Sequence, residues 1–256
     1  MKTTCIMNLK GGTAKTVTAI NLAAILRKDH NQRVLLVDAD SQGNLTEFMT
    51  GELPENQRYT KGGLCDLLTG KEAVCLRPTV LKGVDILPAT DDLMSLDIGS
   101  SGKSADLEAL STMKKDMAGQ YEHMLIDCPP AFSASSVAAL LAADQVIIPM
   151  KLDAFGIRGM ANLLCQIFNM KEVNPRLAVA GILPTMYYKS EQMDEAEDLL
   201  RKFGLPVYPH IRRSTMVDNM TFLQRPLVET SPKSGACRDY RAFAAEFLKG
   251  GGKYGV

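Results

Sequence analysis

Residues 8–16 read NLKGGTAKT, and this stretch separates a short apolar run from a segment with helical spacing. The ordinary P-loop pattern, G-x-x-x-x-G-K-[ST], requires glycine at two positions where this chain carries Leu9 and Ala14 when the pattern is aligned on Lys15 and Thr16. A lysine and a hydroxyl at the point where a strand passes into a helix are nevertheless the groups that hold a phosphate. The stretch therefore predicts a phosphate-binding loop of unusual composition.

Glycines in such a loop let its backbone approach the phosphate closely. Gly11 and Gly12 lie just before the lysine, and a second lysine, Lys10, precedes them. Backbone amides at glycine reach phosphate oxygens closely, Lys15 adds a point charge, and the Thr16 hydroxyl is a ligand for Mg²⁺. Because glycine also serves turn geometry alone, the pair by itself is weak evidence. The leading hypothesis is a nucleoside triphosphate bound with Mg²⁺.

The fold class follows from how apolar runs alternate with helical patterns. Continuous apolarity is typical of strands buried on both faces, and such strands separated by helices predict a doubly wound, mostly parallel α/β sheet with helices on both faces. We expect a single P-loop ATPase domain over residues 1–256, with residues 250–256 a frayed tail. The expected strands lie within 3–9, 33–40, 83–89, 123–130, 145–151 and 177–186, and the expected helices within 16–28, 132–143, 156–172 and 190–203.

Composition argues against a disordered or fibrous protein. The chain has 256 residues with no formal net charge, 46% hydrophobic and 23% charged residues, which is globular usage. No run approaches the 18 or so apolar residues of a membrane span, so we expect a cytoplasmic protein. Six cysteines occur without a C-x-x-C pair, which argues against a zinc or iron–sulfur site.

Carboxylates end two of the expected strands. VLLVDAD places Asp38 and Asp40 at one strand end, and LIDCPP places Asp127 at another. Acids at strand ends are often turn formers or helix caps, but beside a phosphate loop they can hold Mg²⁺ through its waters and orient an attacking water. Three such sites in this order favour a nucleotide-hydrolysing site.

Three motifs together resemble those of a known family. K-G-G-x-x-K-T at 10–16, DADSQGNLT at 38–46 and DCPP at 127–130 resemble the deviant Walker A, Walker A′ and Walker B motifs of the ParA/MinD family of P-loop ATPases. Later segments, including VIIPMKLDAFGIRGMANLL and SPKSGACRDYRAFAAEFL, resemble those of the ParA/Soj partition ATPases, so that the likeness covers nearly the whole chain.

The resemblance implies a role for each motif residue. Lys10 is expected to reach across a homodimer to the partner's nucleotide, and Lys15 to hold phosphate in cis. Asp40 is expected to position the hydrolytic water, with Asp38 as a supporting carboxylate. Catalysis is thus expected from Lys10, Lys15 and Asp40, and Mg²⁺ binding, partly through water, from Thr16, Asp40 and Asp127. The residues expected to bind ATP or ADP are Lys10, Gly11, Gly12, Thr13, Ala14, Lys15, Thr16 and Val17.

The chain departs from the usual family loop, K-G-G-x-G-K-T-T, at two positions, and Ser41 replaces a common proline. Ala14 stands at the last glycine and Val17 at the final threonine. An alanine in a helical conformation costs nothing there, whereas one forced to positive φ costs about 1 kcal/mol or more. We expect Ala14 to be tolerated and ATP still to bind.

Charge is unevenly distributed along the chain. Residues 201–256 carry ten Lys and Arg against four Asp and Glu, net +6, which leaves net −6 for residues 1–200. The resemblance implies an ATP-bound dimer that binds double-stranded DNA without sequence preference, is nucleoid-associated, and is released when a ParB-like centromere-binding protein stimulates hydrolysis. The alternative for any one basic residue is a solubilising surface charge. The candidates for DNA-phosphate contacts are Arg212, Arg213, Lys233, Arg238 and Arg241.

Other functions of the superfamily stay open. The chain starts at its first strand, so we expect no N-terminal helix-turn-helix and no operator binding. A MinD-like positioning ATPase would use an amphipathic terminal helix, but the apolar stripe of residues 240–248 has no basic polar face, and we expect it to pack in the core without membrane binding. The third alternative is a metabolic or redox ATPase, such as the nitrogenase iron protein or a small-molecule ligase.

Overall fold

A computed structural model describes residues 1–51, 61–90, 92–98, 104–202 and 204–250 of the chain. Seven strands form one sheet in the order β3-β4-β2-β5-β1-β6-β7. Neighbouring strands are parallel except β3, which runs antiparallel to β4. The strands are β1 (Lys2–Ile6), β2 (Val34–Asp38), β3 (Arg77–Pro78), β4 (Val84–Leu87), β5 (His123–Asp127), β6 (Gln145–Lys151) and β7 (Ala178–Thr185).

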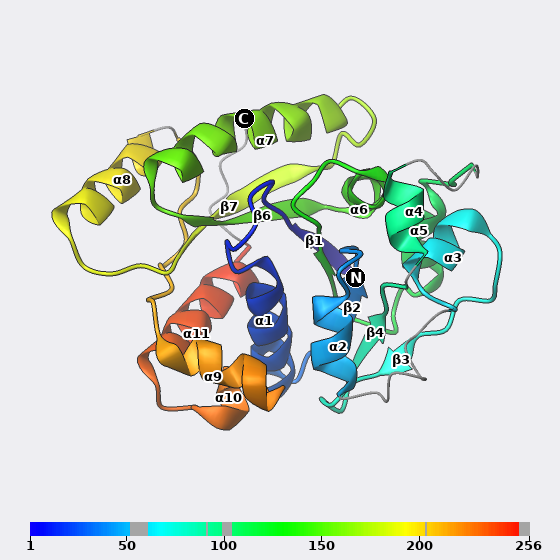
Figure 1. Cartoon of the computed structure of the whole chain (residues 1–256), viewed down its shortest axis with the longest axis horizontal. Helices are drawn as coiled ribbons and strands as arrows, with labels where there is room; N and C mark the ends of the chain where they lie inside the picture. The colour runs from blue at the N-terminus through cyan, green and yellow to red at the C-terminus, as the bar shows by residue number, and fades with distance from the viewer. Residues whose placement is uncertain (52–60, 91, 99–103, 203, 251–256) are drawn as a thin grey trace.

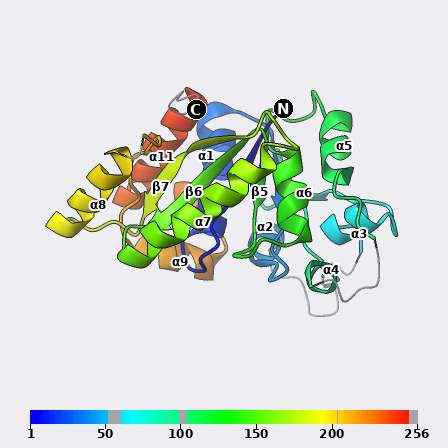
Figure 2. The same cartoon turned by 90° about the horizontal axis from the view of Figure 1, so that it is seen from above.

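Helices cover both faces of this sheet (Figures 1 and 2). One layer holds α1 (Lys15–His30) and α2 (Asn44–Thr50) with α9 (Thr215–Leu223), α10 (Leu227–Thr230) and α11 (Gly235–Leu248). The other layer holds α3 (Leu64–Thr69), α4 (Leu93–Asp97), α5 (Ala109–Asp116), α6 (Ala134–Ala142) and α7 (Ala154–Met170). The remaining helix, α8 (Glu191–Lys202), packs through a smaller apolar cluster shared with α7 and β7.

Strand side chains are divided between the two layers by the period of two along each strand. Ile6 and Leu125 lie in the core beneath α1 and α11, while their chain neighbours Cys5 and Met124 lie in the core beneath α6 and α7. All four are fully buried. Both faces of the central strands are therefore apolar, which explains why the runs in the sequence are continuous rather than alternating.

The predicted fold class is confirmed. Each of the six apolar runs overlaps a strand, and the four helical patterns correspond to α1, α6, α7 and α8. The short β3 and the helices α2 to α5, α9 and α10 were not predicted, because elements of two to nine residues carry too little periodicity to be recognised. The expected tail of 250–256 lies, apart from Gly250, outside the described residues.

The apolar stripe of α11 packs in the core, as expected. Tyr240 and Phe247 are 1% exposed and Phe243 is fully buried, although Leu248 is 37% exposed. No helix in the described part of the chain is both long enough and apolar enough to cross a membrane.

Candidate functional site

The three predicted motifs meet at the carboxyl edge of the sheet. Ile6, the last residue of β1, is in register with Asp127 at the end of β5, and Asp127 is in register with Asp38 at the end of β2. The loop that follows β1 and the turns that follow the other two strands therefore lie side by side. In an open parallel sheet, this edge is where ligands bind.

The loop after β1 presents backbone amides that have no acceptor among the described residues. Between residues 11 and 18, all of which the structure describes, the first amide to donate a hydrogen bond is that of Thr18, to the Ala14 carbonyl at 2.9 Å. Gly12 has φ +69°, and a Cβ added at this glycine would meet nothing within 4 Å, so the space over the loop is open. Free amides at the start of α1, beside the positive end of its dipole, form an anion site.

Ala14 adopts the conformation for which a glycine is normally used. Its φ and ψ are 66° and 30°, the left-handed region, and it is the N-cap residue of α1 without a side-chain capping bond. Ala14 therefore carries the cost of about 1 kcal/mol or more that is expected for an alanine at positive φ. Val17, the other departure, is half-buried and packs against the core beneath α1.

Lys15 is held at the base of the loop. Its side chain is only 7% exposed, and Nζ donates to the Lys10 carbonyl oxygen at 3.1 Å. The Thr13 hydroxyl donates to the same oxygen at 3.4 Å. Burial lowers the pKa of Lys15, while the negative charges of Asp127 and Asp40 act in the opposite direction. A phosphate above the loop would supply the counter-charge that keeps this ammonium ionised.

One of the two carboxylate oxygens of Asp127 is buried without a hydrogen-bond partner from the residues that the structure describes. The Asp127 side chain is 1% exposed, one oxygen accepts from the Thr16 hydroxyl at 2.6 Å, and the other, Oδ1, is buried without a hydrogen bond. Burial and then the charge of Asp38 raise the pKa of Asp127 well above its usual range. A divalent cation would relieve both the missing partner and the charge repulsion, so a hydroxyl and a carboxylate oxygen fit Mg²⁺ here.

The two acids after β2 have different surroundings. Asp38 is fully buried and accepts hydrogen bonds from the Thr46 amide (2.8 Å) and hydroxyl (2.7 Å) and from the Asp40 amide (3.2 Å). Burial raises the pKa of Asp38 to about 6 despite these bonds. Asp40 is partly exposed and accepts from the Gln42 amide at 3.0 Å. Asp38 therefore shapes the turn, and Asp40 is the acid that solvent can reach.

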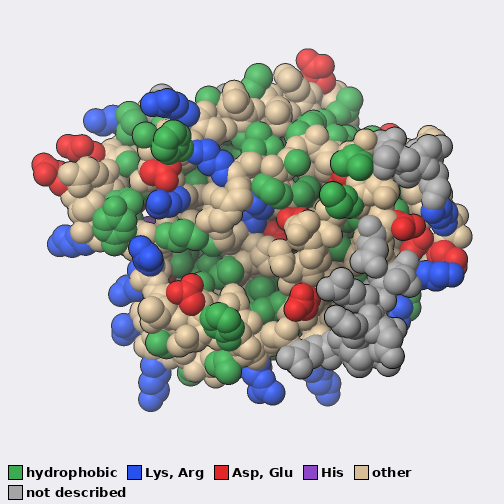
Figure 3. Space-filling model, in the orientation of Figure 1, with side chains coloured by type: hydrophobic (Ala, Val, Ile, Leu, Met, Phe, Trp, Pro, Cys, Tyr) green, Lys and Arg blue, Asp and Glu red, His purple; other side chains and the backbone are tan. Residues whose placement is uncertain are grey.

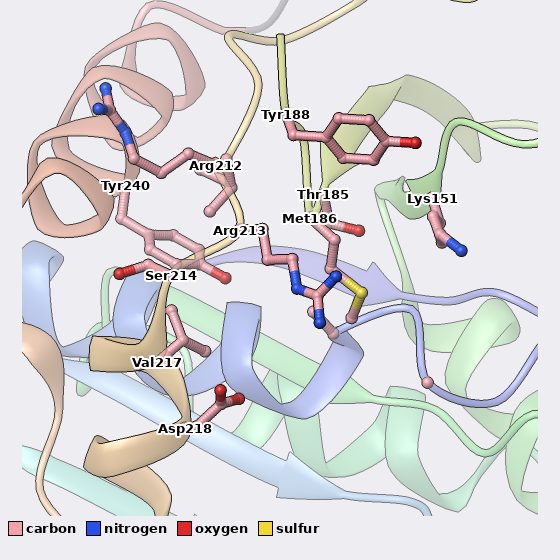
Figure 4. A pocket seen from close by; sticks show the side chains of 13 residues that line it. Lys151, Thr185, Met186, Tyr188, Arg212, Arg213, Ser214, Val217, Asp218 and Tyr240 are labelled. Atoms are coloured by element: carbon pink, nitrogen blue, oxygen red, sulfur yellow. The ribbon is translucent and has the colours of Figure 1, made fainter. Parts of the chain in front are cut away.

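A pocket of about 750 Å³ opens beside the loop. Gly12 and Ala14 form one wall, the end of β7 another, and the segment before α9 a third (Figure 4). Its volume is within the range of small-molecule sites. The pocket is lined by Gly12, Ala14, Lys151, Thr185, Met186, Tyr188, Ile211, Arg212, Arg213, Ser214, Val217, Asp218 and Tyr240.

Comparison with known proteins shows the family to which the chain belongs. A family model described as an AAA domain matches residues 1–179. The chain is 33% identical over 258 residues to the chromosome partitioning protein ParA of Caulobacter vibrioides, covering 97% of this chain and 94% of that protein. It is 34% identical over 247 residues to the chromosome-partitioning ATPase Soj of Thermus thermophilus, covering 95% and 94%. The chain belongs to the ParA/Soj family.

Solved structures share the fold of this chain. Cobyrinic acid a,c-diamide synthase of Mycobacterium smegmatis, with bound ADP and magnesium, aligns at a TM-score of 0.80 and 29% identity, covering 97% of this chain and 94% of that one. The cell division ATPase MinD of Pyrococcus furiosus has the same fold, with a TM-score of 0.77 at 22% identity over 97% and 98%. As a ParA/Soj relative, the protein is an ATPase.

Of the five basic residues predicted to contact DNA, two form ion pairs with acids of the described structure and three do not. Arg212 forms a two-pronged ion pair with Asp239 on α11 (2.7 and 2.9 Å), and Arg241 pairs with Asp29 at 2.7 Å. Arg213 is exposed at the pocket wall, where its guanidinium lies beside Met186, while Arg212 turns away toward α11 (Figure 4).

Lys233 and Arg238 are exposed at the start of α11, and the described residues provide neither with an ion pair. Lys and Arg side chains also project along the lower left margin of Figure 3, where Figure 1 places α9, α10 and α11. This part of the surface of the ParA/Soj-type chain therefore has positive charge that is not neutralised internally.

Sequence reasoning missed the pocket residues contributed by β7 and the segment before α9. Thr185 and Met186 end an apolar run that was recognised as a strand, so the rule that ligands bind at the carboxyl ends of strands would have found them. Tyr188, Ser214 and Asp218 belong to loops and a helix start that carry no motif, and only the folded chain brings them to the loop. Among the described residues, no group of three or more His, Cys, Asp or Glu side chains is arranged to hold a metal ion without a nucleotide.

Proposed function

We propose that this partition ATPase is a nucleotide-driven DNA-segregation switch. In this proposal two copies bind Mg-ATP between them, the dimer binds double-stranded DNA without sequence preference, and a ParB-like partner stimulates hydrolysis and release. The observation that carries it is the phosphate loop with free amides and the orphaned oxygen of Asp127 beside Thr16. The partitioning relatives support the biological role.

Each site residue has a task in this proposal. The amides of residues 11–17 and the Lys15 ammonium bind the phosphates, and Thr16 and Asp127 would hold Mg²⁺, which supplies charge neutralisation at the transferring phosphoryl group. Asp40, which solvent reaches, orients the attacking water. Lys10 of one subunit neutralises charge at the partner's nucleotide.

The pocket beside the loop would take the nucleoside. It adjoins Gly12 and Ala14, so a nucleotide with its phosphates on the loop would extend its base toward β7 and α9. Arg213 stands on this wall. Replacing Arg213 therefore is expected to weaken ATP binding as well as DNA binding, and this residue alone is a poor test of the DNA surface.

Lys233 and Arg238 provide the cleaner test because they are exposed and unpaired in the described structure. DNA binding to a generic duplex is measured with ATP, with ADP and without nucleotide, over a series of salt concentrations. We expect binding with ATP only, and a salt slope that falls by up to about 2 in the double variant Lys233→Ala/Arg238→Ala, since each lost phosphate contact removes about 0.9.

The control removes a positive charge from another part of the surface, and its effect is compared with that of each single variant, Lys233→Ala and Arg238→Ala. Arg176 is exposed just before β7, at the amino edge of the sheet. The start of α11, which carries Arg238, lies near the opposite, carboxyl edge, where Arg212 pairs with Asp239. Arg176→Ala is expected to leave the salt slope unchanged. Equal DNA binding in all three nucleotide states would refute the switch, and an equal loss in the control would refute the assigned surface.

A specific observation weakens one of the two alternatives. A MinD-like positioning ATPase is suggested by fold neighbours, but Tyr240, Phe243 and Phe247 of α11 pack in the core. Leu248, at the end of the helix, is the one exposed large apolar side chain of α11, all of whose residues the structure describes, so α11 presents no continuous apolar face to lipid. A ligase activity is suggested by the name of one structural neighbour. Binding to anionic vesicles with ATP, or ATP hydrolysis that requires a carboxylic acid and an amine donor, would favour these alternatives.

A further inference from the structure

The side chain of Lys10 lies on a helix of its own subunit. Its Nζ is 5.3 Å from the centre of the Phe155 ring, in the first turn of α7. A Cβ added at Gly159 would be 3.0 Å from the Lys10 Cε, so the lysine stem lies directly on the backbone of α7. Residues four apart share one face of a helix. Phe155 and Gly159 therefore form a recess, which we name the lysine slot.

The main chain of Lys10 is fixed independently of this slot. Its amide donates to Asn8 Oδ1 at 3.0 Å, and its carbonyl accepts from Lys15 Nζ at 3.1 Å. Asn8 in turn donates to the Pro149 carbonyl at 2.8 Å. Movement of the Lys10 ammonium thus requires only rotations of its four-carbon chain, with no change in the phosphate loop.

Phe155 is exposed to a degree that core packing does not explain. Its side chain is 71% exposed although it is large and apolar. Asp153, the N-cap residue of α7, adds a negative charge near the slot: burial acts to raise its pKa, but the Gly156 amide and the charges of Lys151 and Lys10 together lower it. The ring and the carboxylate both favour an ammonium at this place.

We propose that the lysine slot holds Lys10 in a resting position on its own subunit, and that Lys10 leaves the slot when it enters the partner's nucleotide site. This inference rests on the proposed function, in which a dimer forms around ATP. Phe155 and Gly159 are then positioning residues. They set how readily the ATP-bound dimer forms, without touching the nucleotide of their own subunit.

Weakening the slot is expected to tighten the dimer. An exposed cation–π contact contributes about 0.5–1 kcal/mol, which corresponds to a factor of about two to five. Two lysines leave two slots in each dimer, so Phe155→Leu should lower the dimer dissociation constant with a non-hydrolysable ATP analogue by about 4- to 25-fold. Gly159→Ala crowds the lysine stem while it keeps the ring, and the change should have the same sign. This second variant separates the slot from any contact that the ring itself makes with a partner.

The same helix offers a matched control. Phe168 is 43% exposed, and Lys171 Nζ is 5.9 Å from its ring centre, near the other end of α7. Phe168→Leu removes an equivalent cation–π pair that does not involve Lys10. It is expected to leave the dimer constant unchanged.

The resting position is tested directly in the nucleotide-free protein by NMR of ¹³C-labelled lysine. The ring current of Phe155 should shift the Lys10 ε-methylene signal, assigned with Lys10→Arg, and this shift should disappear in Phe155→Leu and on addition of the ATP analogue, but persist in Phe168→Leu. A dimer that forms in a protein without this shift refutes the slot alone. A shift that is present in a protein that never dimerises refutes the proposed function but not the resting position. Weaker dimers in both slot variants overturn the proposal.

Discussion

The phosphate loop contains a strained alanine whose replacement has a calculable effect. Ala14 has φ 66° and ψ 30°, and a residue with a Cβ costs about 1–2 kcal/mol more than glycine in this region. Glycine also makes the unfolded chain more flexible, which offsets about 0.4–1 kcal/mol of the gain. Ala14→Gly should therefore raise the free energy of unfolding by about 0.5–1 kcal/mol, or the Tm by about 1–4 °C for a chain of this length.

Nucleotide affinity should respond much less than stability. Ala14 already has the left-handed conformation in the nucleotide-free loop. A loop that keeps this conformation when ATP binds carries the same strain in both states, so the strain cancels in the binding free energy. Gly12→Ala is the reverse experiment, because Gly12 has φ +69° and open space for a Cβ, and it should lower the Tm by a similar amount. Thermal unfolding and ATP titration of both variants test the reasoning. No rise in Tm for Ala14→Gly, or a gain in ATP affinity above about tenfold, 1.4 kcal/mol, would refute it.

Three further predictions concern buried polar groups. Thr16→Val leaves the buried Asp127 carboxylate without its 2.6 Å donor and should lower the free energy of unfolding by about 1–3 kcal/mol in chemical denaturation; unchanged stability would contradict this. Asp127→Asn removes a carboxyl group whose pKa is raised by burial, so the free energy of unfolding of the nucleotide-free protein at pH 7 should rise. The Mg²⁺ affinity of the ATP complex should fall about 10- to 100-fold. A fall in both the stability and the Mg²⁺ affinity would contradict the prediction. Burial lowers the pKa of His123 below 6.5, so the folded state favours its neutral form and the free energy of unfolding decreases as the pH falls below 6.5. His123→Gln should reduce this decrease between pH 7 and pH 5, and an unchanged dependence of the free energy of unfolding on pH would contradict the prediction.

The sequence was most informative where one physical requirement dominates. Buried parallel strands must be apolar on both faces, so the runs that end at Asp38 and Asp127 identified both the sheet and the acids at its carboxyl edge. Lysine, hydroxyl and glycine before a helix identified the phosphate loop for the same reason. What depends on tertiary contact was not predictable. The pairing of Arg212 with Asp239, 27 positions apart, and the position of Arg213 at the pocket follow from how the segment before α9 packs, and charge counting treats both arginines alike.

The proposed switch requires Lys10 to act between two subunits. The most direct test is a crystal structure of the protein with Mg²⁺ and a non-hydrolysable ATP analogue. We predict a two-fold dimer in which Lys10 Nζ has left Phe155 and lies within hydrogen-bond distance of the phosphates bound by the other copy. A nucleotide-bound protein in which Lys10 still lies against Phe155, with no second subunit at the site, would contradict the account.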